Sequence, residues 1–115
     1  MQSKFRLTRS EDFKRVRLHG KSYAHPLVVL VTQASESSQV HVGVTAGKTT
    51  GTAVRRNRAK RLLREAMRPL LPTLATGWDL ILIARPALVS ASLEETRTAL
   101  LTLLRRAKLI LVDES

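Results

Sequence analysis

Residues 54–68 read VRRNRAKRLLREAMR, and this basic segment decides how the rest of the chain is interpreted. It contains six Arg, one Lys and a single acidic residue, Glu65. When each residue advances about 100° around a helix axis, apolar side chains gather on one face of the segment. These apolar side chains are Ala59, Leu62, Leu63, Ala66 and Leu70. The pattern predicts an amphipathic helix over residues 52–71, whose C-terminal end is weakened by Pro69 and Pro72.

Cationic and polar side chains occupy the opposite face of this predicted helix. They are Asn57, Lys60, Arg61, Arg64 and Arg68, with Arg58 at the edge. Such a face is either solvated or a surface for a polyanion. A solvated face normally mixes charges of both signs, whereas here Glu65 is the only acidic residue. Guanidinium groups also suit bidentate contact with phosphate. We therefore predict polyanion binding, without resolving RNA from DNA.

Three apolar segments flank the basic helix and predict strands. They are residues 27–32 (LVVLVT), 40–45 (VHVGVT) and 79–84 (DLILIA). We expect the first two to pair as a hairpin around a polar loop, with Val40, Val42 and Val44 on one face of the second strand.

Two further helices are predicted at the ends of the chain. The first begins near Ser10, as its N-cap, and stops at Gly20. The last begins at a capping box, Ser92 with Glu95, and runs to about residue 108. The resulting order, α-β-β-(β)-α-β-α with one optional strand, predicts an α/β sandwich of one mostly central sheet with helices packed on it.

Length and charge limit the possible functions. A chain of 115 residues is long enough for one domain with a real core, and we expect residues 1–115 to form it, with short flexible termini. Its formal net charge of +11 indicates an anionic partner, nucleic acid before an anionic membrane. The apolar runs are far too short to span a bilayer, the first residues lack a secretory signal, and the absence of cysteine fits a reducing cytoplasm.

Catalytic motifs are not evident in the sequence. The nine acidic residues form no pair suited to a two-metal nuclease, and His19, His25 and His41 lack the spacing of metal ligands. The segment GKTTG at residues 47–51 lacks the spacing of a P-loop. On the residues alone, we predict a binding protein and not an autonomous enzyme.

The basic segment also resembles a long and specific family signature. Residues 51–66, GTAVRRNRAKRLLREA, are similar to the RNR motif of the bacterial ribonuclease P protein subunit. The resemblance extends to RLTRSEDFKRV at residues 6–16, VGVT at 42–45 and DLILIAR at 79–85, and so covers residues 4 to about 108.

This resemblance implies a fold like the second domain of ribosomal protein S5, with a left-handed β-α-β crossover. The general rule for such units predicts a right-handed crossover instead. It implies an accessory subunit that binds a catalytic RNA and the 5′ leader of precursor tRNA. The RNA removes the leader with Mg²⁺ that is bound mainly by the RNA and the substrate. No catalytic residue, protein-bound metal or obligate protein partner is implied, and the complex would be cytoplasmic.

Site residues follow from the resemblance position by position. The residues expected to contact the catalytic RNA are Lys48, Arg56, Asn57, Arg58, Lys60, Arg61, Arg64 and Arg68. Those expected at the leader cleft are Phe13, Arg17, Val31 and Arg85. Thr49 replaces the second residue of a basic pair, and Arg17 and Val31 stand where relatives carry aromatics, so we expect a cleft that stacks bases less and pairs phosphates more.

Two other functions remain possible at this point. A basic module of the ribosome or of its assembly would explain the charge and the fold, although not the signature. A protein nuclease acting without RNA would explain an RNA-processing role, although the sequence offers no residues for the chemistry.

Overall fold

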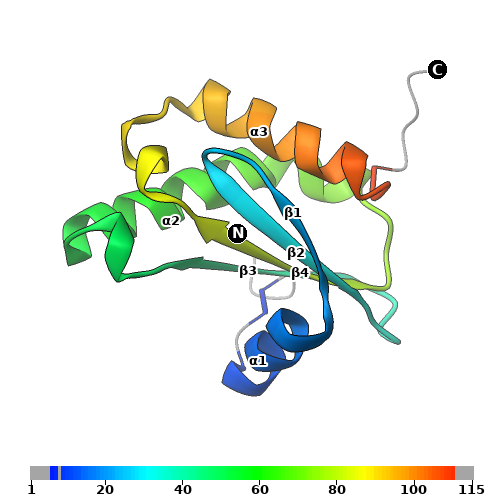
Figure 1. Cartoon of the computed structure of the whole chain (residues 1–115). Helices are drawn as coiled ribbons and strands as arrows, with labels where there is room; N and C mark the ends of the chain where they lie inside the picture. Colours follow the sequence, from blue (N-terminus) through cyan, green and yellow to red (C-terminus); the bar gives the residue numbers. More distant parts are fainter. Residues whose placement is uncertain (1–5, 8, 111–115) are drawn as a thin grey trace.

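The computed structural model describes residues 6–7 and 9–110, and the expected flexible termini lie largely outside these residues. Three helices and four strands follow one another in the order α1-β1-β2-β3-α2-β4-α3 (Figure 1). Their bounds are α1 Ser10–His19, β1 Lys21–Ala24, β2 Val28–Ala34, β3 Val40–Ala46, α2 Ala53–Met67, β4 Trp78–Ala84 and α3 Leu93–Arg106. This order confirms the predicted α/β arrangement, but the extra strand is β1, which precedes the strand at residues 27–32 and does not follow the one at residues 40–45.

The four strands form one sheet in the order β1-β2-β4-β3, so the predicted hairpin of β2 with β3 is wrong. Strand β4 lies between them, antiparallel to β2 and parallel to β3. At its start, Gly77 accepts a hydrogen bond from the Ser35 amide (2.8 Å) and donates one to the Gln39 carbonyl (3.0 Å). The two ends of the polar loop are thus held apart, one on each side of β4. A strand that is buried on both faces gains most from this central position.

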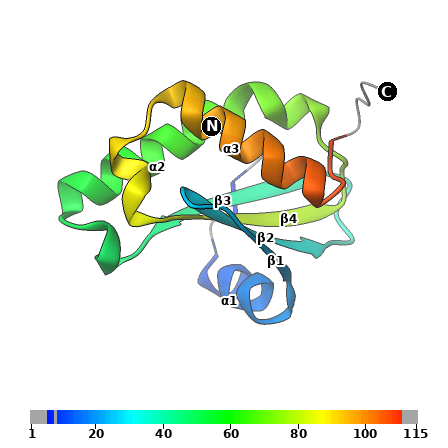
Figure 2. The same ribbon diagram turned by 45° about the horizontal axis from the view of Figure 1, so that its top comes forward.

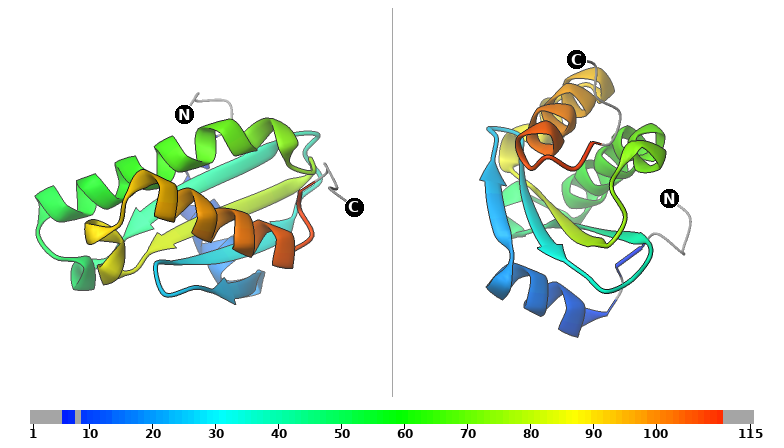
Figure 3. Two further views of the ribbon diagram at one scale, coloured as in Figure 1. Left: turned by 90° about the horizontal axis from the view of Figure 1, so that it is seen from above. Right: turned by 90° about the vertical axis from the view of Figure 1, so that its right-hand side faces the viewer.

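Helices cover the two faces of the sheet unequally (Figures 2 and 3). Helices α2 and α3 pack together on one face, over a large core that includes Leu30, Val42 and Leu82. Helix α1 lies alone on the other face, over a small core of Leu7, Val16, Val31 and Ile81. Because one short helix cannot cover the whole sheet, part of this second face remains open.

The crossover from β3 through α2 to β4 is left-handed. With the helices toward the viewer (Figure 3, left), both strands run to the left and β4 lies below β3. This is the handedness that the family resemblance implies and the opposite of the general rule.

Helix α2 begins where the Thr52 hydroxyl accepts a hydrogen bond from the Arg55 amide (3.3 Å). It ends at Met67, earlier than predicted, because a 3₁₀ segment, η3 (Arg68–Thr73), with prolines at two positions follows it. Ala59, Leu63 and Ala66 are fully buried as expected. Met67 is also fully buried, whereas Leu62 is only half-buried, so the apolar face is centred closer to Met67 than the sequence predicted.

The ends of α1 differ from the predictions, whereas the start of α3 confirms them. Arg9, and not Ser10, is the N-cap of α1, and it makes no side-chain capping bond. Gly20 ends α1 in an extended conformation and not in a left-handed one. A side chain there would lie 2.7 Å from the Thr32 carbonyl oxygen, so close packing explains this glycine. The capping box of Ser92 and Glu95 is present at the start of α3.

None of the helices in residues 6–7 and 9–110 has the length and apolar character needed to cross a membrane.

Candidate nucleic-acid interface

The cationic face of α2 is formed as predicted and lies on the surface. The side chains of Asn57, Arg58, Arg61 and Arg68 are exposed, while those of Arg56, Lys60 and Arg64 are half-buried. Glu65 pairs with Arg68 one turn further along the helix. Along the rest of this face no acidic side chain of a described residue forms an ion pair with a guanidinium group.

A pocket of about 260 Å³ joins this helix to the open face of the sheet. Its lining comes from the chain before α1, from α1, β3 and α2, and comprises Arg6, Leu7, Phe13, Val42, Gly43, Val44 and Arg64. The half-buried ring of Phe13 lies directly over Gly43, where any side chain would collide with it. The pocket therefore offers one aromatic surface beside cations.

Two arginines, Arg6 and Arg64, line this pocket. Partial burial lowers the pKa of the Arg64 guanidinium, and the positive charge of Arg6 lowers it further. Arg64 Nε is buried and has no hydrogen-bond partner among the described residues. A buried donor without a partner is costly, and two like charges repel. A phosphate between Arg6 and Arg64 would offset this repulsion.

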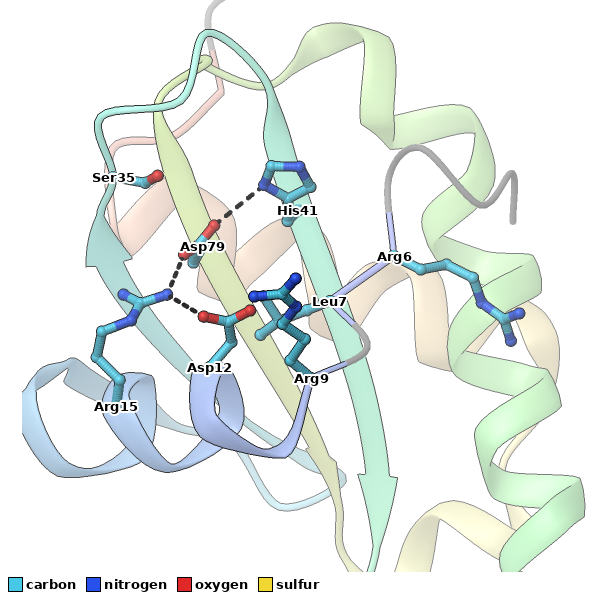
Figure 4. Close-up of a pocket in the computed structure, with 8 residues that line it drawn as sticks. All are labelled: Arg6, Leu7, Arg9, Asp12, Arg15, Ser35, His41 and Asp79. Atoms are coloured by element: carbon cyan, nitrogen blue, oxygen red, sulfur yellow. Dashed lines mark hydrogen bonds and ion pairs between the residues drawn. The ribbon is translucent and has the colours of Figure 1, made fainter.

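An ion-pair cluster fixes α1 across the sheet (Figure 4). Asp79, at the start of β4, is buried and accepts hydrogen bonds from Arg15 (2.6 Å) and from His41 Nδ1 (3.2 Å). Arg15 also bonds Asp12 (3.2 Å) and the side-chain oxygen of Gln33. The hydrogen bond to Asp79 is the main cause that raises the pKa of Arg15. The cluster ties α1 to three strands and so fixes the position of Phe13.

A second pocket of about 310 Å³ opens beside this cluster. It shares Arg6 and Leu7 with the Phe13 pocket and is further lined by Arg9, Asp12, Arg15, Ser35, His41 and Asp79. The Arg6 side chain turns toward α2, away from Asp79 (Figure 4). The two pockets form one cation-lined track along the edge of β3, where residue 6 pairs with Val42.

Of the residues predicted for the leader cleft, only some lie at the Phe13 pocket. Phe13 lines the cleft, and Arg17 is exposed one helical turn later. Val31 is a correction: only 3% of it is exposed, because it packs under α1 with Val16, and it offers no surface to a ligand. Lys48 and Arg85 are exposed and line neither pocket. They follow β3 and β4, whose last residues, Ala46 and Ala84, are paired, so both cations lie at the same end of the sheet.

Sequence reasoning missed several residues that shape this surface. Arg6, Arg9 and Gly43 lie within the segments 6–16 and 42–45 that resemble the family, but the sequence does not mark them as site residues. The sequence shows only that His41 lacks the spacing of a metal ligand, because its bond to Asp79 joins positions 38 apart. The only local signal was the i, i+3 spacing of Asp12 and Arg15.

Metal-binding clusters are also absent from the part of the chain that the structure describes: no three His, Asp or Glu side chains there lie close enough together to hold an ion. The chemistry that this surface supports is the binding of phosphates and unpaired bases.

Comparison with known proteins gives a consistent result. The family model described as Ribonuclease P matches residues 1–108. The ribonuclease P protein component of Herpetosiphon aurantiacus is 40% identical over 109 residues, which span 95% of this chain and 89% of that protein. That of Brevibacillus brevis is 37% identical over 111 residues, spanning 96% and 88%.

Solved structures agree with the sequence matches. The RNase P protein of Staphylococcus aureus superposes with a TM-score of 0.82 at 28% identity, over 92% of this chain and 97% of that one. The RNase P protein of Thermotoga maritima gives a TM-score of 0.78 at 28% identity, over 88% and 96%. With a signature helix, an open cationic cleft and matches over nearly its whole length, this chain belongs to the ribonuclease P protein family.

Proposed function

We propose that this protein binds the RNA subunit of ribonuclease P through the cationic face of α2 and the 5′ leader of precursor tRNA through the Phe13 pocket. The complex acts in the cytoplasm and releases the leader, leaving the mature 5′ end of the tRNA. One observation carries this proposal: Arg64 belongs both to the cationic face of α2 and to the pocket under Phe13. A single continuous surface can therefore hold two RNA molecules side by side.

In this proposal, the protein binds RNA and the RNA subunit carries out the catalysis. The cleft offers guanidinium groups, an aromatic ring and apolar side chains, which bind and orient a strand. Asp79, the buried carboxylate nearest the track, already accepts hydrogen bonds from Arg15 and His41. We infer that the RNA subunit and the substrate hold Mg²⁺, which would activate the water that attacks the phosphodiester.

The rival interpretation as a ribosomal or assembly module is not favoured, because the family and structural matches are to ribonuclease P proteins. A protein nuclease that acts alone is tested by incubating the RNA-free protein with precursor tRNA and Mg²⁺. We expect no cleavage, and cleavage at low Mg²⁺ once the RNA subunit is added. Cleavage by RNA-free protein would contradict the proposal.

The leader contact is tested with Phe13→Ala in the reconstituted holoenzyme. We expect affinity for precursor tRNA with a leader to fall by about fivefold or more, because one base loses a stacking surface worth about 1–3 kcal/mol. Affinity for mature tRNA, which has no leader, should not change.

The control for this test is Leu18→Ala, also in α1, whose side chain is 77% exposed. It should leave both affinities as in the unmodified protein. Because the Phe13 ring also covers the small core, the melting temperature of each variant is measured alongside. An equal loss for both substrates would show that Phe13 acts through stability alone and not through the leader.

A further inference from the structure

A third hollow lies on the other side of α2, away from the Phe13 pocket. It has a volume of about 210 Å³ and is lined by Arg58, Arg61, Leu62, Glu65 and Leu93. Leu62 comes from α2 and Leu93 from the first turn of α3, which packs beside α2 (Figure 3). Leu93 is 37% exposed, less than Leu18 and Val54, the other two large apolar residues at the surface of the described residues. The hollow thus has an apolar floor and a charged rim.

The rim of this hollow is held in place by hydrogen bonds. Arg58 Nε donates to the Val89 carbonyl oxygen (3.1 Å), which anchors the guanidinium to the segment before α3. The Glu65 carboxylate is held by Arg68. The bond to Val89 therefore orients the planar cation beside the leucines before any ligand arrives, which lowers the entropic cost of binding. The Glu65–Arg68 pair is exposed and constrains the carboxylate less.

The charges of the hollow select among the parts of an RNA strand. Arg58 and Arg61 attract the strand, but Glu65 in the rim would repel a phosphate placed inside. A nucleobase has apolar faces and a polar edge, so its faces suit the leucines and a guanidinium plane. A carboxylate accepts hydrogen bonds from an exocyclic amino group, as Glu does from cytosine N4.

We propose that this hollow receives one unpaired nucleobase with an exocyclic amino group, presented by the RNA subunit. The base lies on Leu62 and Leu93, stacks against Arg58 and donates its amino group to Glu65. Its backbone then follows the cationic face of α2. This inference rests on the proposed binding of the RNA subunit and adds a base-reading site to it.

The test compares Leu93→Asn, which is nearly isosteric but polar, with Leu18→Asn on the opposite side of the sheet. Two probes are used: the RNA subunit, and inorganic polyphosphate, which is anionic but has no bases. Leu93→Asn should bind the RNA subunit about five- to tenfold more weakly, in the range of one lost base contact, and bind polyphosphate normally. Leu93→Met, which keeps an apolar side chain at this position, should bind the RNA subunit as tightly as the unmodified protein. Leu18→Asn should match the unmodified protein on both probes.

The role of Glu65 is tested with single-stranded oligo(C) and oligo(U). The unmodified protein should prefer oligo(C), and Glu65→Gln should remove the preference, because an amide donates to uracil as readily as it accepts from cytosine. The comparison of two oligonucleotides cancels the change in charge.

Several outcomes would overturn the base-reading site. One is equal RNA affinity of Leu93→Asn and Leu18→Asn. Another is a loss on polyphosphate as large as the loss on RNA, which would indicate a general effect on charge or folding. Unchanged RNA affinity with a reduced dimer fraction would assign the hollow to a second copy of the chain. If the unmodified protein itself fails to bind the RNA subunit, the proposed function fails first.

Discussion

Gly43 and Phe13 show how one small residue creates a binding surface. Gly43 lies in the middle of β3, and its missing side chain leaves the space that the Phe13 ring occupies. The tip of the ring can then approach the strand closely while the residue remains half-exposed and lines the pocket. A larger residue would push the ring away from Arg64 and separate the aromatic surface from its cations.

Gly43→Ala tests this arrangement. We expect it to destabilise the protein by roughly 1–3 kcal/mol, because the added methyl group must displace a packed ring, and to weaken leader binding as well. Thermal melting provides the measurement. The control is Gly47→Ala, where a side chain would have no atom within 4 Å and stability should change little. If the two variants melt alike, the ring is free to move and the packing argument is wrong.

Helix α2 serves the core and the surface at the same time. Its buried face packs over the sheet and against α3, and its cationic face lies directly opposite. Because both faces belong to one rigid helix, the rotation of the helix about its axis sets which cations reach the RNA. Anything that loosens the core beneath α2 should therefore disturb RNA binding without touching a cation.

Leu63→Ala examines the buried face of α2. Leu63 is fully buried, so truncation should reduce the free energy of unfolding by roughly 2–5 kcal/mol. Val54→Ala, in the same helix but 76% exposed, should change it by less than about 0.5 kcal/mol. Denaturant unfolding of both variants gives the comparison. Equal stabilities would mean that the rotation of α2 is wrong, and the assignment of its cationic face with it.

The net charge of the molecule and its distribution have different effects. An overall charge of +11 attracts any polyanion from a distance. Contacts that neutralise particular phosphates depend on which surface carries the charge. Helix α2 presents cations next to the cleft, whereas Arg105 and Lys108 are exposed at and just beyond the far end of α3.

Two double variants with the same change in charge separate these effects. Lys60→Gln with Arg61→Gln should make the salt dependence of RNA-subunit binding shallower by about one to two counterions. Arg105→Gln with Lys108→Gln removes the same charge elsewhere and should leave the slope nearly unchanged. The slope of affinity against salt concentration is the measurement. Equal slopes for the two variants would mean that only the total charge matters.

Local patterns in the sequence determined much of this protein. The period of apolar residues in α2, the alternation in β3 and the capping box of α3 each involve residues a few positions apart, and each was predicted correctly in type. The cationic face followed from the same period. The signature at residues 51–66 indicated the family that the comparisons show. The rotation of α2 was predicted less well, because Met67 and Leu62 lie near the boundary between its faces.

Only the tertiary structure decided how these elements meet. Strand β4 lies between β2 and β3 and forms hydrogen bonds along both of its edges. No local pattern in the sequence predicts this order of the strands. The same arrangement buries Val31 under α1 and brings Arg6, Phe13 and Arg64 around one pocket. Asp79 binds Arg15 across 64 positions for the same reason. Contacts between residues far apart in the chain depend on the packing of whole elements, and local periodicity carries no information about them.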